Sequence, residues 1–118
     1  MDMQAGSEWV VDVYGCDPDT LRSLSRLQAL AEAIVAELQL RPLGAPVWHQ
    51  FPGPAGITGV VVLSESHLTC HTFPEQGYAA LNLYCCSPRA PWPWEERLRA
   101  ALGAREVRVT ELRRGDRT

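Results

Sequence analysis

The sequence predicts an α+β fold, a two-layer sandwich in which helices cover one face of a mainly antiparallel sheet. Six short segments rich in β-branched, aromatic and apolar residues are typical of strands. Two segments with apolar residues three or four positions apart are typical of amphipathic helices. Their order, β-α-β-β-β-β-α-β, places four strands in succession, which favours an α+β arrangement. At 118 residues the chain suits a single domain with one core.

The first third of the chain predicts one strand and one helix. Trp9 to Tyr14 combines aromatic and β-branched residues and predicts a strand. Asp17 followed by Pro18 is a typical helix start, with Asp17 as the N-cap and proline at the first helical position. Apolar residues at helical spacing then predict one amphipathic helix from Pro18 to about Leu40.

Four strands are expected next, with glycine or proline near their boundaries. They span Val47 to Phe51, Gly59 to Ser64, His67 to Phe73 and Tyr78 to Cys86. The second of these is the most apolar and is therefore expected in the centre of the sheet.

The last of these strands, a second helix and a final strand complete the expected fold. In the strand ending at Cys86, alternation places Cys85 on one face with leucine and alanine side chains, and Cys86 on the other, more polar face. A helix is expected from Pro93 or Trp94 to Leu102. The alternating segment from Glu106 to Leu112 predicts the last strand.

Composition excludes several classes of function. The net charge of −3 argues against nucleic acid as the main partner, and no apolar run is long enough to span a membrane. All eleven basic residues are arginine, so the lysine on which P-loop and pyridoxal phosphate chemistry depends is missing.

The four cysteines lack zinc spacing and are expected to be reduced thiols. Residues 1–8 are expected to form a flexible leader of a cytoplasmic protein.

Much of the reactive chemistry lies between Ser64 and Gly77. His67 and His71 resemble a pair of metal ligands, but residues four apart on a strand lie about 13 Å from each other and cannot share one ion, so no metal is expected. A serine hydrolase is a second alternative, although Ser66 lies in no Gly-x-Ser-x-Gly elbow. Neither pattern explains the stretch.

The chain resembles the S-adenosylmethionine decarboxylase proenzymes of bacteria and archaea. The specific motifs are Glu65-Ser66-His67 and His71-Thr72-Phe73-Pro74-Glu75 at their mutual spacing. The resemblance extends to the apolar Gly59-Val60-Val61-Val62 segment, to Gly77-Tyr78-Ala79-Ala80 and to Cys86, and so covers most of the chain.

This resemblance implies a proenzyme that cuts its own backbone between Glu65 and Ser66. Attack of Ser66 Oγ on the Glu65 carbonyl gives an ester, and elimination then releases a β chain of residues 1–65 and an α chain of residues 66–118. Ser66 becomes a pyruvoyl group, which forms a Schiff base with the substrate amine. By resemblance, His71 moves protons during processing, and Thr58 assists where relatives have serine.

The resemblance also assigns residues to turnover and substrate binding. Cys86 matches the acid that returns a proton to the substrate, a role that suits a thiol because it is mostly protonated near neutral pH. Glu75 matches a ribose-binding residue, Phe51 is the expected partner for adenine, and His67 is a further candidate. Ser66 and His71 would lie about 16 Å apart on opposite faces of one strand, so the chain is expected to turn near Ser66.

Departures from the family pattern leave two other functions open. The turn at residues 52–54 is one residue longer than usual, and Asn82 and Cys85 replace an aspartate and a threonine. Such changes suit an ornithine or arginine decarboxylase that uses the same pyruvoyl machinery, and a further alternative is an uncleaved partner subunit. The main interpretation is decarboxylation of S-adenosylmethionine for spermidine synthesis, and the resemblance implies a homodimer whose sheets face each other.

Overall fold

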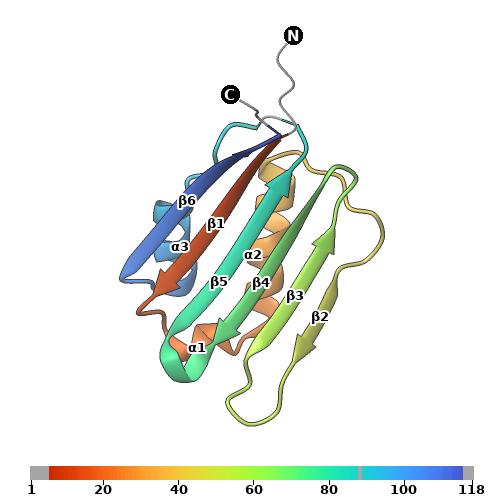
Figure 1. Cartoon of the computed structure of the whole chain (residues 1–118). Helices are drawn as coiled ribbons and strands as arrows, with labels where there is room; N and C mark the ends of the chain where they lie inside the picture. The colour runs from red at the N-terminus through yellow and green to blue at the C-terminus, as the bar shows by residue number, and fades with distance from the viewer. Residues whose placement is uncertain (1–5, 88, 116–118) are drawn as a thin grey trace.

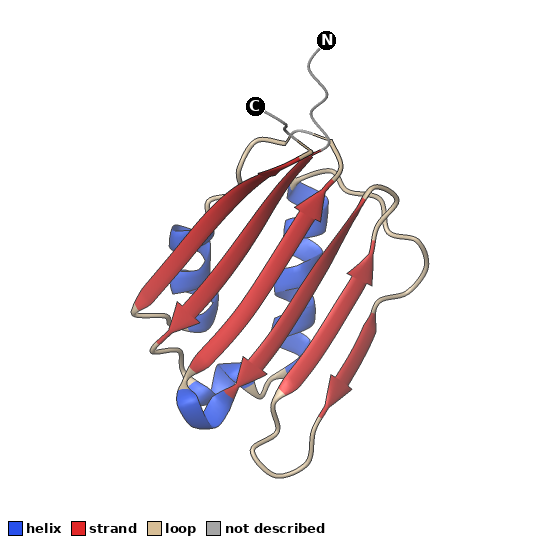
Figure 2. Cartoon of the chain, viewed as in Figure 1, coloured by secondary structure: helices blue, strands red, loops and turns tan. Residues whose placement is uncertain are grey.

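The computed structural model describes residues 6–87 and 89–115 as a six-stranded antiparallel sheet with helices on one face only (Figures 1 and 2). This confirms the predicted α+β architecture. The strands are β1 (Gly6–Tyr14), β2 (Val47–Gln50), β3 (Ile57–Val62), β4 (Ser66–Phe73), β5 (Tyr78–Cys85) and β6 (Glu106–Arg114). The helices are α1 (Pro18–Leu21), α2 (Leu24–Glu37), α3 (Trp94–Leu102) and the short 3₁₀ helix η1 (Pro74–Gln76).

The strands lie in the order β2-β3-β4-β5-β1-β6, so the prediction that the apolar third strand is central was wrong. Strands β2 to β5 follow one another as neighbours, but β1 pairs with β5 and thereby moves β4 and β5 to the centre. The apolar sequence of β3 does not reflect burial on both faces. Val61 is 5% exposed, whereas Val62, on the face without helices, is 52% exposed.

The predicted helix from Pro18 to Leu40 is two helices. Ser23 has an extended backbone, and its hydroxyl accepts a hydrogen bond from the Arg26 N–H at 3.4 Å, so it caps α2 and separates it from α1. Helix α2 ends at Glu37, and Gln39 then adopts a left-handed conformation with φ of 56°. This turn directs the chain back toward the sheet.

Strand β1 starts earlier than predicted. Of the residues expected in a leader, Ser7 and Glu8 pair with both β5 and β6, and Gly6 pairs with β6. The rest of the expected leader, residues 1–5, lies outside the described residues. Other strand ends shift by one or two residues; β3 ends at Val62, two residues earlier than predicted, because residues 63–65 form the turn into β4.

The core lies between the sheet and the three α-helices. Its largest buried side chains include Trp9 and Leu83 from the sheet and Leu27, Ile34 and Leu98 from the helices. Burying these side chains supplies the main driving force for folding. Among residues 6–87 and 89–115, no helix is long and apolar enough to cross a membrane.

A buried hydroxyl joins the helical layer to two strands. Thr72 on β4 accepts a hydrogen bond from the Ile57 N–H at 2.9 Å and donates one to the Leu21 carbonyl at 2.8 Å. Thr72 is 4% exposed, so both hydrogen bonds are shielded from water. The start of β3 and the end of α1 are thereby fixed against β4, which carries the candidate site.

Candidate active site

The Glu65–Ser66 peptide lies in the tight turn between β3 and β4. The Leu63 N–H donates to the Ser66 carbonyl at 3.0 Å and closes the turn. The Ser64 N–H donates to the Arg41 carbonyl at 2.8 Å, so the segment after α2 holds the turn from the other side. Ser66 is the first residue of β4 and lies opposite Cys85 of β5.

The carbonyl of Glu65 accepts a hydrogen bond from the backbone N–H of Cys86 at 2.7 Å. This donor would stabilise negative charge on the Glu65 oxygen during attack on its carbonyl carbon, as an oxyanion hole does. The structure therefore brings three of the predicted residues, Glu65, Ser66 and Cys86, to the same end of the sheet.

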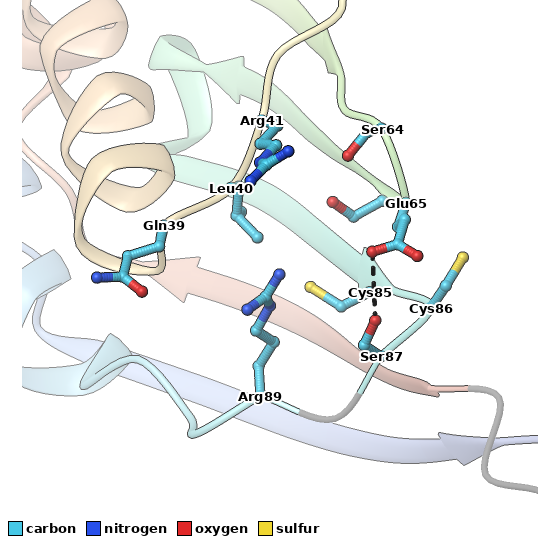
Figure 3. Close-up of a pocket in the computed structure, with 10 residues that line it drawn as sticks. Gln39, Leu40, Arg41, Ser64, Glu65, Cys85, Cys86, Ser87 and Arg89 are labelled. Atoms are coloured by element: carbon cyan, nitrogen blue, oxygen red, sulfur yellow. Dashed lines mark hydrogen bonds between the residues drawn. The ribbon is translucent and has the colours of Figure 1, made fainter.

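The two adjacent cysteines have different environments. Cys85 is 2% exposed, and burial raises the pKa of its thiol. Cys86 is exposed, and Figure 3 shows its sulfur directed away from that of Cys85. The prediction that Cys85 belongs to the core and Cys86 to the other face is confirmed.

The remaining cysteines are buried away from the turn. Burial raises the pKa of Cys16 to about 11 and that of Cys70 to about 12, so both thiols stay protonated. Both are free cysteines, in agreement with the reduced thiols that the sequence predicts. Within residues 6–87 and 89–115, no three His, Cys, Asp or Glu side chains form a cluster that could hold a metal ion.

The other predicted residues gather at the opposite end of β4. Thr58 lies opposite His71 in the β3–β4 pairing, and its hydroxyl lies 3.0 Å from His71 Nδ1. Phe51 and Glu75 line the same cavity of about 450 Å³ as Thr58 and His71. The Phe51 ring also packs edge-on against His49, with 4.5 Å between ring centroids.

Ser66 and His71 are not brought together within one chain. Strand β4 pairs with β5 without interruption from Ser66 to Phe73, so the turn expected near Ser66 does not fall between Ser66 and His71. The turn instead precedes Ser66. At about 3.3 Å per residue, the two residues lie about 16 Å apart along the strand, on opposite faces.

His67 lies at the Ser66 end, on the face of the sheet without helices. Its ring stacks on Tyr84 of β5, with 5.7 Å between centroids. Close by, Asn82 donates to Glu8 at 2.8 Å, and Arg114 donates to the same carboxylate at 2.6 Å. These hydrogen bonds lower the pKa of Glu8, which favours its ionised form paired with Arg114.

A cavity of about 710 Å³ adjoins the Glu65–Ser66 bond (Figure 3). Its lining includes two residues that the sequence did not single out, Arg41 and Arg89. Arg41 follows the end of α2, and Arg89 belongs to the loop before α3. No motif marked either residue, because only the packing of these two segments against the β3–β4 turn brings them to the site.

Comparison with known proteins agrees with the predicted resemblance. Residues 7–115 match the model of the S-adenosylmethionine decarboxylase family. An S-adenosylmethionine decarboxylase proenzyme of Caldicellulosiruptor saccharolyticus is 40% identical over 115 residues, covering 93% of this chain and 88% of the relative. One of Thermotoga petrophila is 39% identical over 111 residues, covering 93% and 84%.

A solved structure supports the fold as well. The crystal structure of the adenosylmethionine decarboxylase from Aquifex aeolicus superposes with a TM-score of 0.78 at 27% sequence identity. The match covers 95% of this chain and 92% of the Aquifex chain.

Proposed function

The chain belongs to the S-adenosylmethionine decarboxylase family, and from this premise we propose that it is a self-processing, pyruvoyl-dependent decarboxylase of S-adenosylmethionine that serves spermidine synthesis. One structural observation carries the proposal. The Glu65 carbonyl, which must be attacked for self-cleavage, is held at 2.7 Å by the Cys86 N–H. This contact polarises the carbonyl of the bond that the proposal requires to break.

Processing begins with the chain's own residues. Ser66 Oγ attacks the Glu65 carbonyl carbon, the Cys86 N–H stabilises the oxygen, and the C–N bond breaks to leave an ester. Removal of the Ser66 α-proton then expels the Glu65 carboxylate and leaves dehydroalanine at residue 66, which water hydrolyses to the pyruvoyl group with loss of ammonia. The products are the β chain of residues 1–65 and the α chain of residues 66–118.

The surroundings of Ser66 fit a pyruvoyl group made from it. A cavity of about 710 Å³ adjoins the residue, and the neighbouring Cys86 is exposed. The pyruvoyl group would supply a ketone that accepts electrons as carbon dioxide leaves the substrate. Cys86 then holds a proton on Sγ and delivers it to the substrate α-carbon.

We propose that His71 reaches this bond from a second copy of the chain. Within one chain, β4 holds His71 about 16 Å from Ser66, beyond direct proton transfer. The face that carries His71 has no helices, and Val10, Val60 and Ala80 on it are half-buried. A twofold pair of facing sheets can place the His71 end of one chain over the Ser66 end of its partner.

The cavity at the His71 end supports nucleoside binding. Phe51, which is 51% exposed, offers a ring face for adenine, and Glu75 offers a carboxylate for ribose hydroxyls. In the same cavity, the Thr58 hydroxyl orients the His71 ring through Nδ1. Its other nitrogen is then the one that moves protons for the partner chain.

Intact-mass measurement of the purified protein tests the proposal. We expect two chains with the masses of residues 1–65 and 66–118, and a pyruvoyl group at residue 66. Ser66→Ala should abolish cleavage and carbon dioxide release together. Finding only an unmodified 13.1 kDa chain in the wild type would refute the proposal.

An assay with three substrates tests the specificity. We expect carbon dioxide release from S-adenosylmethionine, with ornithine and arginine turned over at background rates. Ornithine or arginine turnover above that of S-adenosylmethionine would assign the chain to amino-acid decarboxylation.

A further inference from the structure

The lining of the cavity beside the Glu65–Ser66 bond carries one more positively charged side chain than negatively charged ones. It is lined by Gln39, Leu40, Arg41, Ser64, Glu65, Ser66, Cys85, Cys86, Ser87 and Arg89. Among these described residues there are two guanidinium groups and one carboxylate. The Glu65 carboxylate also accepts a hydrogen bond from the Ser87 hydroxyl at 3.4 Å.

Arg41 is tied directly to the turn that contains the bond. The Arg41 carbonyl accepts a hydrogen bond from the Ser64 N–H, and the next residue, Pro42, forms an isolated antiparallel β-bridge with Leu63. Leu40, only 8% exposed, anchors the segment in the core. Arg41 therefore keeps its place beside the turn through backbone contacts, which leaves its side chain available.

The loop before α3 fixes the position of Arg89. This residue precedes the buried Trp92, whose indole N–H donates to Glu37 at the end of α2 at 3.0 Å. The Arg89 Nε is buried and has no hydrogen-bond partner among the described residues, although the guanidinium group also interacts with the Cys85 thiol. A buried donor without a partner favours an acceptor that arrives later.

Both guanidinium groups and the Glu65 carboxylate project into the same space (Figure 3). We propose that Arg41 and Arg89 receive the α-carboxylate that self-cleavage creates on Glu65. The inference rests on the proposed function. It adds an anion site for the new end of the β chain, built by two residues outside the family motifs described above.

The site would act on a defined step. When the α-proton of residue 66 is removed, its electron pair forms the Cα=Cβ bond, the Cβ–O bond breaks, and Glu65 leaves as a carboxylate with the electrons of that bond. Guanidinium groups stabilise the charge that develops on the leaving oxygen. After cleavage residue 65 carries two negative charges, which match the two arginines.

Time courses of self-cleavage in freshly refolded protein test this role. In Arg41→Gln/Arg89→Gln, we expect elimination to slow by about tenfold or more, and the ester to accumulate. The ester has the intact mass, and hydroxylamine converts it to a β chain ending in a hydroxamate and an α chain beginning with unmodified Ser66. The charge-retaining double lysine variant should cleave at an intermediate rate, since lysine lacks the planar fork of arginine.

Arg99→Gln is the matched control, because Arg99 lies on α3 and pairs with Glu95 away from the cavity. It should cleave like the wild type. A double glutamine variant that also cleaves at the wild-type rate, or that slows without accumulating ester, would overturn the inference while leaving the proposed function intact. An uncleaved wild type would overturn both.

Thermal unfolding gives a readout that does not depend on rate. In the uncleavable Ser66→Ala chain, the two glutamine substitutions should change Tm little, because the new carboxylate is never formed. In protein incubated until cleavage is complete, the same substitutions should lower Tm by several degrees more. Equal shifts in both backgrounds would contradict a role for the arginines in holding the cleaved end.

Discussion

The two ends of β4 carry different halves of the predicted chemistry. At its beginning, Ser66 adjoins the Cys86 N–H and a polar cavity of about 710 Å³ that contains two arginines. At its other end, His71 contacts Thr58 beside a cavity of about 450 Å³ that Phe51 lines. On the proposed mechanism, one end holds the bond to be cut, and the other holds the side chains that assist cleavage and bind the substrate.

The sheet itself fixes the distance between these ends. Eight consecutive residues of β4 pair with β5, and five of them also pair with β3, so the strand cannot bend locally without losing ladder hydrogen bonds. Folding of one chain thus keeps the two ends apart. If the proposed roles hold, motifs that are close in the sequence belong to different active sites.

The largest predicted effect comes from mixing two inactive chains. Co-expressed Ser66→Ala and His71→Ala chains, labelled with different tags, should form mixed dimers in which the His71→Ala chain is cleaved. Random pairing of equal amounts gives this partner to roughly half of the His71→Ala chains. Mass spectrometry of each tagged chain measures the cleaved fraction.

The control replaces the Ser66→Ala partner with a chain that carries both substitutions and so supplies no His71. Cleavage should then fall to the level of the His71→Ala chain alone. If His71→Ala chains are cleaved no better with the Ser66→Ala partner than with the doubly substituted one, His71 acts within its own chain.

The second effect separates processing from turnover at the Ser66 end. Cys86→Ala keeps the backbone N–H that binds the Glu65 carbonyl, so cleavage should proceed at nearly the wild-type rate. Loss of the thiol removes the proposed proton donor and should lower kcat by about 10²- to 10⁴-fold. Intact mass measures the first quantity and carbon dioxide release the second.

Cys16→Ala is a suitable comparison, because Cys16 is buried near Gly77 at the other end of the sheet. It should retain both processing and turnover. Failure of Cys86→Ala to cleave would show that the Cys86 thiol, and not only its backbone, takes part in processing.

The sequence predicted the layers of this fold well, because the alternation of apolar and polar residues along a strand indicates which side chains are buried. Ala79, Leu81, Leu83 and Cys85 are all buried, as period two on β5 required. The sequence-based prediction of helix boundaries failed where a local hydrogen bond interrupts the apolar periodicity. Ser23 interrupts an otherwise continuous helical pattern, and only its capping hydrogen bond to Arg26 reveals the break.

The candidate site was predicted only in part, for a related reason. Motif spacing identified Ser66, His71 and Cys86, and the resemblance grouped them in one site. Distance on an unbroken strand then separated His71 from the other two. Arg41 and Arg89 could not be predicted, since their position depends on how α2 and the loop before α3 pack at the turn.

The smallest predicted effect concerns recognition at the His71 end. Phe51→Ala removes the exposed ring proposed to stack on adenine, and such stacking contributes about 1–3 kcal/mol per base. We expect KM for S-adenosylmethionine to rise by about tenfold, with kcat and the rate of self-cleavage nearly unchanged. Val47→Ala, at an exposed position on β2, is the control and should change none of these quantities.

This last measurement also distinguishes the roles within one cavity. Thr58 and His71 share the cavity with Phe51, so a general disturbance of its shape would slow processing as well as weaken substrate binding. An increase in KM alone places Phe51 in recognition and leaves proton movement to His71. An unchanged KM would mean that another surface binds the adenine. The His71 end of β4 would then have no role in nucleoside binding.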